Sequence, residues 1–275
     1  NDGHALQTTR HPSGERIWAH NFNLNSIFKP AVCWTQVTDA GSSFRYYPRG
    51  FLFDAAAGLG QPNSSGTMEP ILGLLNSTVS EVVQSFLNPT RNILPGTLSA
   101  IPTATVDVDA VVSRLVAMAE ADWNYSEISW DFTSLPLLQA EFRQPGLKGN
   151  YKALRAHWRD MTLEMQRLEE ANNRIYINAY GLQDELKPDV LLNEISLTCN
   201  PHYRYGGDKS EDELEALLLS DTMRELVSYA VGCMFGRYSL DKPGLILVNQ
   251  GETIEDYLRQ VPTPSFGADD DNVIP

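Results

Sequence analysis

Short apolar runs alternate with turn-forming residues over the first third of the chain. β-Branched and aromatic residues gather at positions 17–18, 31–37 and 44–47, and glycine, proline and aspartate separate these runs. Runs of this length between turn residues are typical of β-strands. The Gly-, Pro- and Ser-rich stretch of residues 58–66 that follows is expected to be a loop.

Past this stretch, apolar residues recur every three or four positions as far as Asn88, which precedes a proline and therefore disfavours further helix. Apolar residues at this spacing lie on one face of an α-helix. The pattern predicts one continuous helix over residues 70–88, with Leu75, Val79 and Phe86 buried on its inner face.

Two further amphipathic helices are predicted, over residues 106–122 and 151–179, and Gly181 is expected to end the second as a left-handed cap. Their apolar stripes favour a packed helical bundle over a coiled coil. The stripes consist of Val108, Val112, Leu115 and Met118, then Leu154, Trp158, Met161, Met165 and Leu168.

The remainder of the chain combines one strand signal with helix signals. Residues 190–199 form an apolar run that predicts a strand. Residues 210–213 read SEDE, a capping box in which the serine and the last glutamate bond each other's backbone N–H groups, so a helix is expected to begin there. Helix is also expected over 221–238, before a Pro- and Asp-rich tail.

These elements predict an α+β protein in which a small mixed sheet is followed by a mainly helical region. A chain of 275 residues exceeds one typical domain. We expect a sheet-containing part over 1–105, a helical spacer over 106–182, and a helical C-terminal region with an acidic tail over 183–275.

The net charge of −14 counts against nucleic-acid binding by the chain as a whole. The charge is uneven, however. Residues 1–105 carry six basic and six acidic side chains, whereas residues 208–275 carry five basic and fourteen acidic ones. The first third can therefore face DNA without strong repulsion.

The rest of the composition fits a cytoplasmic protein. No apolar run reaches the roughly 18 residues expected of a membrane-spanning helix. Three widely separated cysteines argue against a disulfide framework and for a reducing compartment. The chain begins at Asn1 where a methionine would start a complete reading frame, which is expected of a fragment or a processed chain.

One short motif is typical of methyl transfer to an amine. Residues 200–203 read Asn-Pro-His-Tyr, close to the Asn/Asp-Pro-Pro-Tyr/Phe loop in which an amide accepts a bond from the target amine and the ring stacks on a flipped base. Here His202 replaces the second proline, and no Gly-rich cofactor loop precedes the motif at a suitable distance. An ordinary turn is the favoured interpretation.

Other site signals are weaker. Pro188-Asp189 and Glu194 distantly resemble a nuclease motif, but Ser196 stands where that site needs a lysine. The histidines and cysteines lack metal-ligand spacing, so no metal site is expected. Four aromatic residues are interpreted as core, with base stacking as the alternative: Trp123, Tyr125, Trp130 and Trp158.

Two sets of segments resemble adenine methyltransferases. The first looks like the target-recognition region of fused restriction-modification enzymes, and comprises residues 44–54, 71–77 and 86–92 with the Ile-Pro pair at 101–102. The second closely resembles the PglX family, the adenine-specific DNA methyltransferases of BREX phage-defence systems, in the part beyond the methyltransferase domain. It comprises NRIYINAYGL (173–182), NPHYRYG (200–206), SYAVGCMFGRY (228–238) and NQGET (249–253).

This resemblance implies that the whole protein transfers a methyl group from S-adenosyl-L-methionine to the N6 atom of adenine in a short double-stranded DNA site. It also implies that the protein works with other BREX components and that phage DNA-mimic inhibitors can bind it. The segment itself is expected to be non-catalytic and to bind neither cofactor nor metal. Residues 200–203 match a second, non-catalytic position in the family.

Sequence-specific reading needs Arg, Asn and Gln side chains for base edges and phosphates. Six residues offer them in turns beside the apolar runs of the first third, and we expect these to contact DNA: Arg45, Arg49, Gln61, Asn63, Arg91 and Asn92. The alternative is a protein-interaction module in which residues 208–275 dock other subunits of the defence complex and DNA contact is minor.

Overall fold

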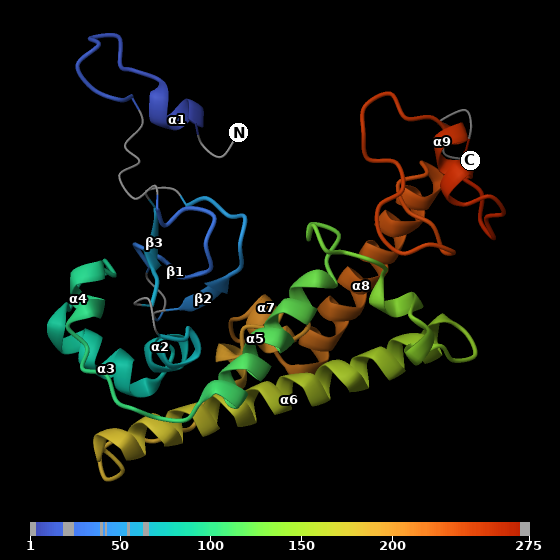
Figure 1. The fold of residues 1–275 in the computed structure, drawn as a ribbon. Coiled ribbons are helices and arrows are strands. Elements are labelled where there is room, and N and C mark those ends of the chain that lie inside the picture. Colours follow the sequence, from blue (N-terminus) through green and yellow to red (C-terminus); the bar gives the residue numbers. More distant parts are fainter. Residues whose placement is uncertain are drawn as a thin grey trace. The chain divides into compact units, whose positions relative to one another are not determined.

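A computed structural model describes residues 4–18, 25–38, 41, 43–53, 56–62 and 66–269. The chain folds as two compact units, Asn1–Asp109 with Ile175–Lys187, and Ala110–Arg174 with Pro188–Pro275 (Figure 1). The predicted α+β class is confirmed, because a small sheet accompanies a majority of helices. The division at residues 105 and 182 stays a prediction.

The first unit contains a three-stranded sheet. Strands β1 (Ala31–Thr35), β2 (Phe44–Tyr47) and β3 (Ala57–Gly60) lie in the order β2-β1-β3, and both pairs are antiparallel. The strands predicted at 31–37 and 44–47 are confirmed. The run at 17–18 contributes an isolated bridge between Arg10 and Ile17.

Strand β3 corrects the loop predicted from residue 58. Trp34 of β1 pairs with Gly58 of β3, and a Cβ atom added to Gly58 would lie 2.1 Å from Cε2 of the Trp34 ring. The buried indole therefore lies directly on the β3 backbone, and its Nε1 donates to the Ile93 carbonyl at 3.0 Å. Glycine in a strand can mark such a close approach, although its low β-propensity suggests a loop.

The helix predicted over 70–88 is divided into α2 (Glu69–Leu75) and α3 (Thr78–Leu87). Asn76 lies at this break, and its side chain forms two hydrogen bonds with the sheet. Its Oδ1 accepts from the Phe44 N–H and its Nδ2 donates to the Phe44 carbonyl, both at 3.0 Å. The amide thus bonds the outer edge of β2 as a neighbouring strand would. Covering an edge in this way satisfies backbone groups that would otherwise invite pairing with another chain.

Burial along the two helices agrees with the prediction for Leu75 and Val79 and contradicts it for Phe86, whose exposed fraction is 81%. The inner face of α3 is centred on Ser80 and Gln84, which are buried and bonded to each other at 3.0 Å. At about 100° per residue, Phe86 lies roughly 120° around the helix from Ser80. The break after α2 changes the phase of the stripe, so Phe86 faces outward.

Because Val79 is buried and Phe86 is exposed, truncating these two side chains should have unequal effects. Val79→Ala should lower the free energy of unfolding by about 2 kcal/mol, because a fully buried side chain loses apolar contacts. Phe86→Ala should change it by less than about 0.5 kcal/mol, because most of the ring is already in water. Urea denaturation of both variants checks this, and a larger loss for Phe86→Ala would contradict the helix phase.

Two more elements complete the first unit. Helix α1 spans His4–Thr8 and α4 spans Pro95–Ser99. The end of the long helix α6 (Leu147–Tyr180) also belongs to this unit, where the Tyr176 hydroxyl donates to the Pro70 carbonyl at 2.7 Å. Gly181 follows with a φ of +69°, the predicted left-handed cap.

The second unit is a helical bundle built along α6. Helices α5 (Asp109–Asn124), α7 (Pro201–Tyr205) and α8 (Glu211–Met234) pack beside it, and α9 (Ile254–Gln260) follows (Figure 1). The helices predicted over 106–122 and 151–179, and the packed bundle, are confirmed. Short 3-10 helices at Pro136–Leu138, Ala140–Phe142 and Leu192–Glu194 interrupt the connectors.

The core of this unit draws on every part of the bundle. From α6 it takes three residues of the predicted stripe, Leu154, Trp158 and Met165, while Leu115 and Met118 of α5 pack partly buried against them. Arg155 of α6 and Glu215 of α8 form a salt bridge between the two helices, in which Arg155 Nη2 donates to Glu215 Oε1 at 2.6 Å. Among the helices that the structure describes, none is long and apolar enough to cross a membrane.

The start of α8 confirms the capping box. Ser210 Oγ accepts from the Glu213 N–H at 3.3 Å, and Glu213 Oε2 accepts from the Ser210 N–H at 2.8 Å. The helix then runs unbroken through the predicted start at Asp221 and ends at Met234, before Gly236 with a φ of +69°. The expected extension to Tyr238 is therefore wrong, because the backbone turns at Gly236.

Candidate nucleic-acid interface

Two of the predicted DNA-contact residues, Arg49 and Gln61, lie near the start of β1, and a third, Arg45, lies beside its middle. Arg45 is on β2, opposite Cys33, and its side chain is exposed. Arg49, also exposed, follows the end of β2, where Tyr47 pairs with Ala31. Gln61 directly follows β3 on the other edge of the sheet.

Gln61 has a structural role that the sequence did not indicate. Its Nε2 donates to the Ser26 carbonyl at 3.1 Å and to the Pro30 carbonyl at 3.2 Å. The amide therefore fastens the segment that enters β1 to the end of β3. Its N–H groups already have partners, which leaves the side-chain oxygen for another contact. Asn63, the fourth predicted residue, lies outside the described residues.

Arg91 and Asn92 lie at the other end of β1. The Arg91 carbonyl accepts from the Thr38 N–H at 3.1 Å, and Asn92 forms a bridge with Val37. The adjacent Ile93 N–H donates to the Gln36 carbonyl at 2.8 Å. This segment therefore continues the pairing along β1 beyond the start of β3, with the side chains of Arg91 and Asn92 exposed.

The structure thus separates the predicted residues into two groups. Arg49 and Gln61 lie near Ala31, whereas Arg91 and Asn92 lie near Thr38. Seven residues of extended chain at about 3.3 Å each place these ends roughly 20 Å apart. Arg45 lies between them on β2. Arg45 and Arg49 lie on the β2 side of β1, whereas Gln61, Arg91 and Asn92 lie on its β3 side, so the residues do not form one cluster.

The Asn-Pro-His-Tyr motif begins α7, and Asn200 is its N-cap. The Asn200 side chain is fully buried, its Nδ2 donates to the Leu192 and Ile195 carbonyls at 2.7 and 2.8 Å, and its Oδ1 accepts from the His202 N–H at 3.2 Å. The oxygen that would accept from a target amine in a catalytic loop is therefore already bonded. This geometry supports the interpretation as a structural turn.

Residues 190–199 do not form the predicted strand. They contain the short 3-10 helix Leu192–Glu194 followed by a segment of turns in which Ile195, Leu197 and Cys199 are buried. This alternation resembles a strand, but side chains replace a neighbouring strand as hydrogen-bond partners. Asn200 binds the carbonyl groups of the segment, and Asp122 of α5 binds its N–H groups.

Asp122 has a structural role that the sequence pattern did not indicate. Its exposed fraction is 3%, and its Oδ2 and Oδ1 accept from the backbone N–H groups of Thr198 at 2.6 Å and Cys199 at 3.1 Å. One signal was available, because Asp122 follows Leu115 and Met118 at helical spacing. A carboxylate on the apolar face of a helix must be satisfied by a buried donor.

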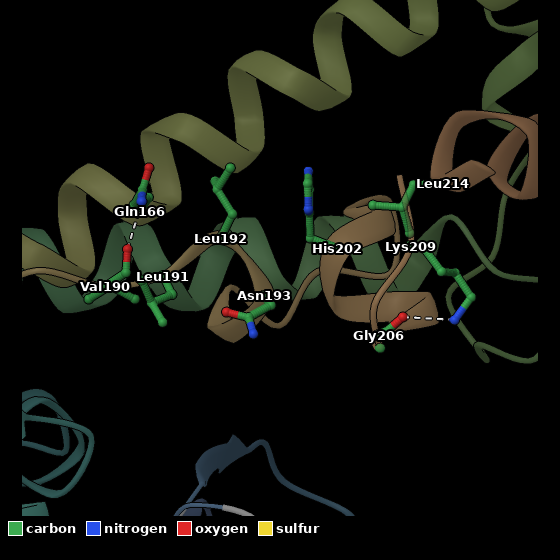
Figure 2. Close-up of a pocket in the computed structure, with 10 residues that line it drawn as sticks. Gln166, Val190, Leu191, Leu192, Asn193, His202, Gly206, Lys209 and Leu214 are labelled. Carbon is green, nitrogen blue, oxygen red and sulfur yellow. Dashed lines mark hydrogen bonds between the residues drawn. The ribbon is translucent and has the colours of Figure 1, made fainter. Parts of the chain in front are cut away.

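A cavity of about 480 Å³ opens beside α7 (Figure 2). Its polar groups already have partners: Lys209 Nζ donates to the Gly206 carbonyl at 2.8 Å, His202 Nε2 lies 3.1 Å from Glu211 Oε1, and Gln166 donates to the Val190 carbonyl. Lys209 in particular satisfies the end of α7. These side chains are therefore committed to the fold, and the cavity is a poor phosphate site.

Nucleophilic and metal-binding chemistry is also limited among the described residues. Burial raises the pKa of the Cys199 thiol well above its usual range, and the nearby Asp122 carboxylate raises it further. The thiol thus stays protonated, which makes it a poor nucleophile. Across the described part of the chain, no group of three or more His, Cys, Asp or Glu residues is placed to hold a metal ion.

The chain is similar to two curated proteins over most of its length. No protein-family model matches it. It is 32% identical over 251 residues to the adenine-specific methyltransferase PglX of Lacticaseibacillus casei (strain Zhang), covering 89% of the chain and 20% of that protein. It is 31% identical over 261 residues to the adenine-specific methyltransferase BrxX of Escherichia coli O9:H4 (strain HS), covering 92% of the chain and 21% of that protein. The predicted family resemblance is confirmed: the chain is PglX/BrxX-like along about nine-tenths of its residues and spans about one-fifth of the length of these relatives.

Proposed function

We propose that this chain is the DNA-recognition and scaffold part of a site-specific N6-adenine DNA methyltransferase that acts in BREX phage defence. The observation that carries the proposal is the similarity along nine-tenths of the chain to proteins named adenine-specific methyltransferases. In the whole protein, S-adenosyl-L-methionine would supply the methyl group at a site outside this chain. The segment itself would bind double-stranded DNA in the cytoplasm and catalyse nothing alone.

The division of labour follows from the reaction. An enzyme that methylates a base within a duplex must extrude it into a catalytic pocket, while the surrounding sequence is read separately at base edges. The amide of Asn200 is bonded on both sides within the fold, which supports a structural role for the only Asn-Pro-x-Tyr motif of the printed sequence.

The first unit has features suited to reading DNA. Arg45, Arg49 and Arg91 have exposed side chains and follow the sheet over roughly 20 Å. That length corresponds to about six base-pair steps at 3.4 Å each, the span of a short recognition site. Residues 1–105 carry equal numbers of acidic and basic side chains, so this part of the chain has no net negative charge to repel phosphate.

The full-length protein provides the test. For each of the three variants Arg45→Ala, Arg49→Ala and Arg91→Ala, we expect altered methylation of DNA in cells that carry it. An arginine that reads guanine through two hydrogen bonds contributes about 1–3 kcal/mol of discrimination, so its loss relaxes one base pair of the site. An arginine that contacts only phosphate weakens binding to all sequences and lowers the salt slope by about one unit.

Methylation mapping by sequencing, together with binding at several salt concentrations, separates these outcomes. Arg167→Ala is the matched control, because Arg167 is an exposed arginine of the second unit paired with Glu164 at 2.8 Å. Wild-type methylation of the same site by all three first-unit variants would contradict the proposal for DNA reading.

The alternative is a protein-interaction module, and one observation favours it. Residues 208–275 carry fourteen acidic side chains against five basic ones, and large apolar side chains such as Val227 and Val248 are exposed there. Such a surface suits docking of other defence-complex subunits. Hydrogen-exchange mapping with a phage DNA-mimic inhibitor distinguishes the two roles, since protection around β2 supports DNA reading and protection confined to 208–275 supports docking.

A further inference from the structure

Three large apolar side chains are exposed around the turn that joins α3 to α4 in the first unit (Figure 1). The exposed fractions are 81% for Phe86, 48% for Leu87 and 44% for Leu94. Phe86 and Leu87 are the last two residues of α3, and Leu94 is the N-cap of α4. Single exposed apolar residues are common, but three around one turn indicate a surface on which another molecule packs.

The turn itself is held in one shape by the side chains of Asn88 and Thr90. Asn88 Nδ2 donates to the Asn92 carbonyl at 2.7 Å, and Asn88 Oδ1 accepts from the Thr90 N–H at 3.2 Å and from the Thr90 hydroxyl at 2.7 Å. Thr90 Oγ1 accepts in addition from the Asn92 N–H at 3.3 Å. The turn therefore fixes the end of α3, with Phe86, relative to Arg91. A surface fixed before binding loses less entropy when a partner arrives.

The charge of this segment favours a polyanionic partner. Residues 82–105 contain no aspartate or glutamate, and Arg91 is their only charged side chain, in a chain whose net charge is −14. The Arg91 side chain is exposed. Glu81, the nearest carboxylate before Phe86 along the chain, lies about 140° around α3 from it. A molecule that carries phosphates can therefore approach Phe86 and Arg91 without meeting a carboxylate of residues 82–105.

Duplex DNA complements both features of this surface. Its phosphates suit an exposed arginine, and the faces of its base pairs are flat and apolar, which suits an aromatic ring. Phenylalanine and leucine are among the side chains that proteins insert between base pairs, and such insertion unstacks one step and kinks the duplex by roughly 20–90°. An enzyme that modifies a base within a duplex needs the stack to open, because the base must leave it to react.

We propose that Phe86, with Leu87 beside it, inserts between two adjacent base pairs of bound duplex DNA and kinks the duplex there, while Arg91 holds the DNA next to that step. This role rests on the proposed function of DNA recognition, to which it adds a side chain that opens the base stack. It also accounts for an aromatic ring that the fold leaves in water although it contributes little to stability. The same ring packed against a protein surface is the competing explanation.

The bend of the DNA gives a direct test in the full-length protein. A duplex oligonucleotide that contains the methylated site carries a fluorescent donor at one end and an acceptor at the other, so that energy transfer reports the distance between its ends. Wild-type protein should raise the energy transfer as it binds. Phe86→Ala should abolish most of this rise and weaken binding by about tenfold, because the apolar burial of the ring is lost although the cost of unstacking is saved.

Three controls keep the test decisive. Phe86→Trp retains a flat aromatic face and should keep both the bend and the affinity, whereas a polar ring substitute is not needed for either. Trp130→Ala removes an aromatic side chain of the second unit that is 92% exposed, and should leave the bend and the affinity unchanged. The melting temperature of Phe86→Ala without DNA should equal that of the wild type, because the ring is mostly in water.

Three results would overturn the proposal. They are a straight duplex in the complex with wild-type protein, a bend and an affinity that Phe86→Ala leaves unchanged, and a lowered melting temperature of DNA-free Phe86→Ala, which would mean that the ring packs against another part of the protein. Failure of the proposed function looks different, since the three arginine variants would then methylate the wild-type site. Altered methylation in those variants with an unchanged bend in Phe86→Ala would reject only the inserted ring.

Discussion

Asp122→Ala is expected to destabilise the helical unit by about 2–4 kcal/mol, because one buried and one partly buried backbone N–H group each lose a charged acceptor. The Asp122 carboxylate accepts from the N–H groups of Thr198 and Cys199 at 2.6 and 3.1 Å, and these bonds attach the segment before α7 to α5. Ile195 and Leu197 of the same segment belong to the core.

Two measurements check this expectation. Urea denaturation gives the loss in the free energy of unfolding, and hydrogen exchange of the Thr198 and Cys199 amides reports the same bonds locally. Asp122→Asn should lose an intermediate amount, since its amide keeps one acceptor oxygen but directs an N–H group at a backbone donor. Asp160→Ala, at an exposed position of α6, is the matched control and should change stability by less than about 0.5 kcal/mol. Unchanged exchange at both amides in Asp122→Ala would contradict the assignment.

Gly58→Ala should destabilise the first unit by about 3 kcal/mol, at the upper end of the usual overpacking cost. The added methyl group would lie 2.1 Å from the ring of Trp34. That ring cannot easily give way, because it is buried and its Nε1 is bonded to the Ile93 carbonyl. Either the sheet opens between β1 and β3 or the indole leaves its position.

Gly60→Ala is the control that isolates this contact. Gly60 lies on the same strand, and its added Cβ would meet the nearest atom, Cζ3 of Trp34, at an ordinary 3.6 Å. Neither glycine has a positive φ, so backbone strain does not distinguish the two variants. Chemical denaturation should show a large loss for Gly58→Ala only, accompanied by a change in near-ultraviolet circular dichroism. Equal stability of the two variants would mean that Trp34 does not lie on β3.

Much of the helical structure was predictable because its determinants are local. A helix bonds residues four apart, and its ends are set by neighbours in sequence. The capping box of Ser210 with Glu213 and the left-handed Gly181 therefore stand where the sequence indicated. The PglX/BrxX likeness was also predictable, since its motifs are continuous stretches of sequence.

The candidate site was predictable only in part. Residue type indicated Arg45, Arg49 and Arg91 as candidates and all three are exposed, but Arg45 lies on strand β2 and not in the predicted turn. Their arrangement along β1, in two groups with Arg45 between, depends on strand pairing. The two hydrogen bonds of Gln61 to the Ser26 and Pro30 carbonyls depend on which distant groups the fold brings near.

What the sequence by itself determined is thus the long helices over 106–122 and 151–179, the start of α8, the cap at Gly181 and the family likeness, because each rests on residues close together along the chain. The tertiary structure decided which side of a helix is buried, which extended segment becomes a strand and which buried polar group has a partner. Phe86 is exposed because its helix has another phase, residues 190–199 use Asp122 and Asn200 where a strand would use a neighbour, and Gly58 joins the sheet under Trp34. In each case the deciding contact comes from a residue distant in sequence, which a local pattern cannot specify.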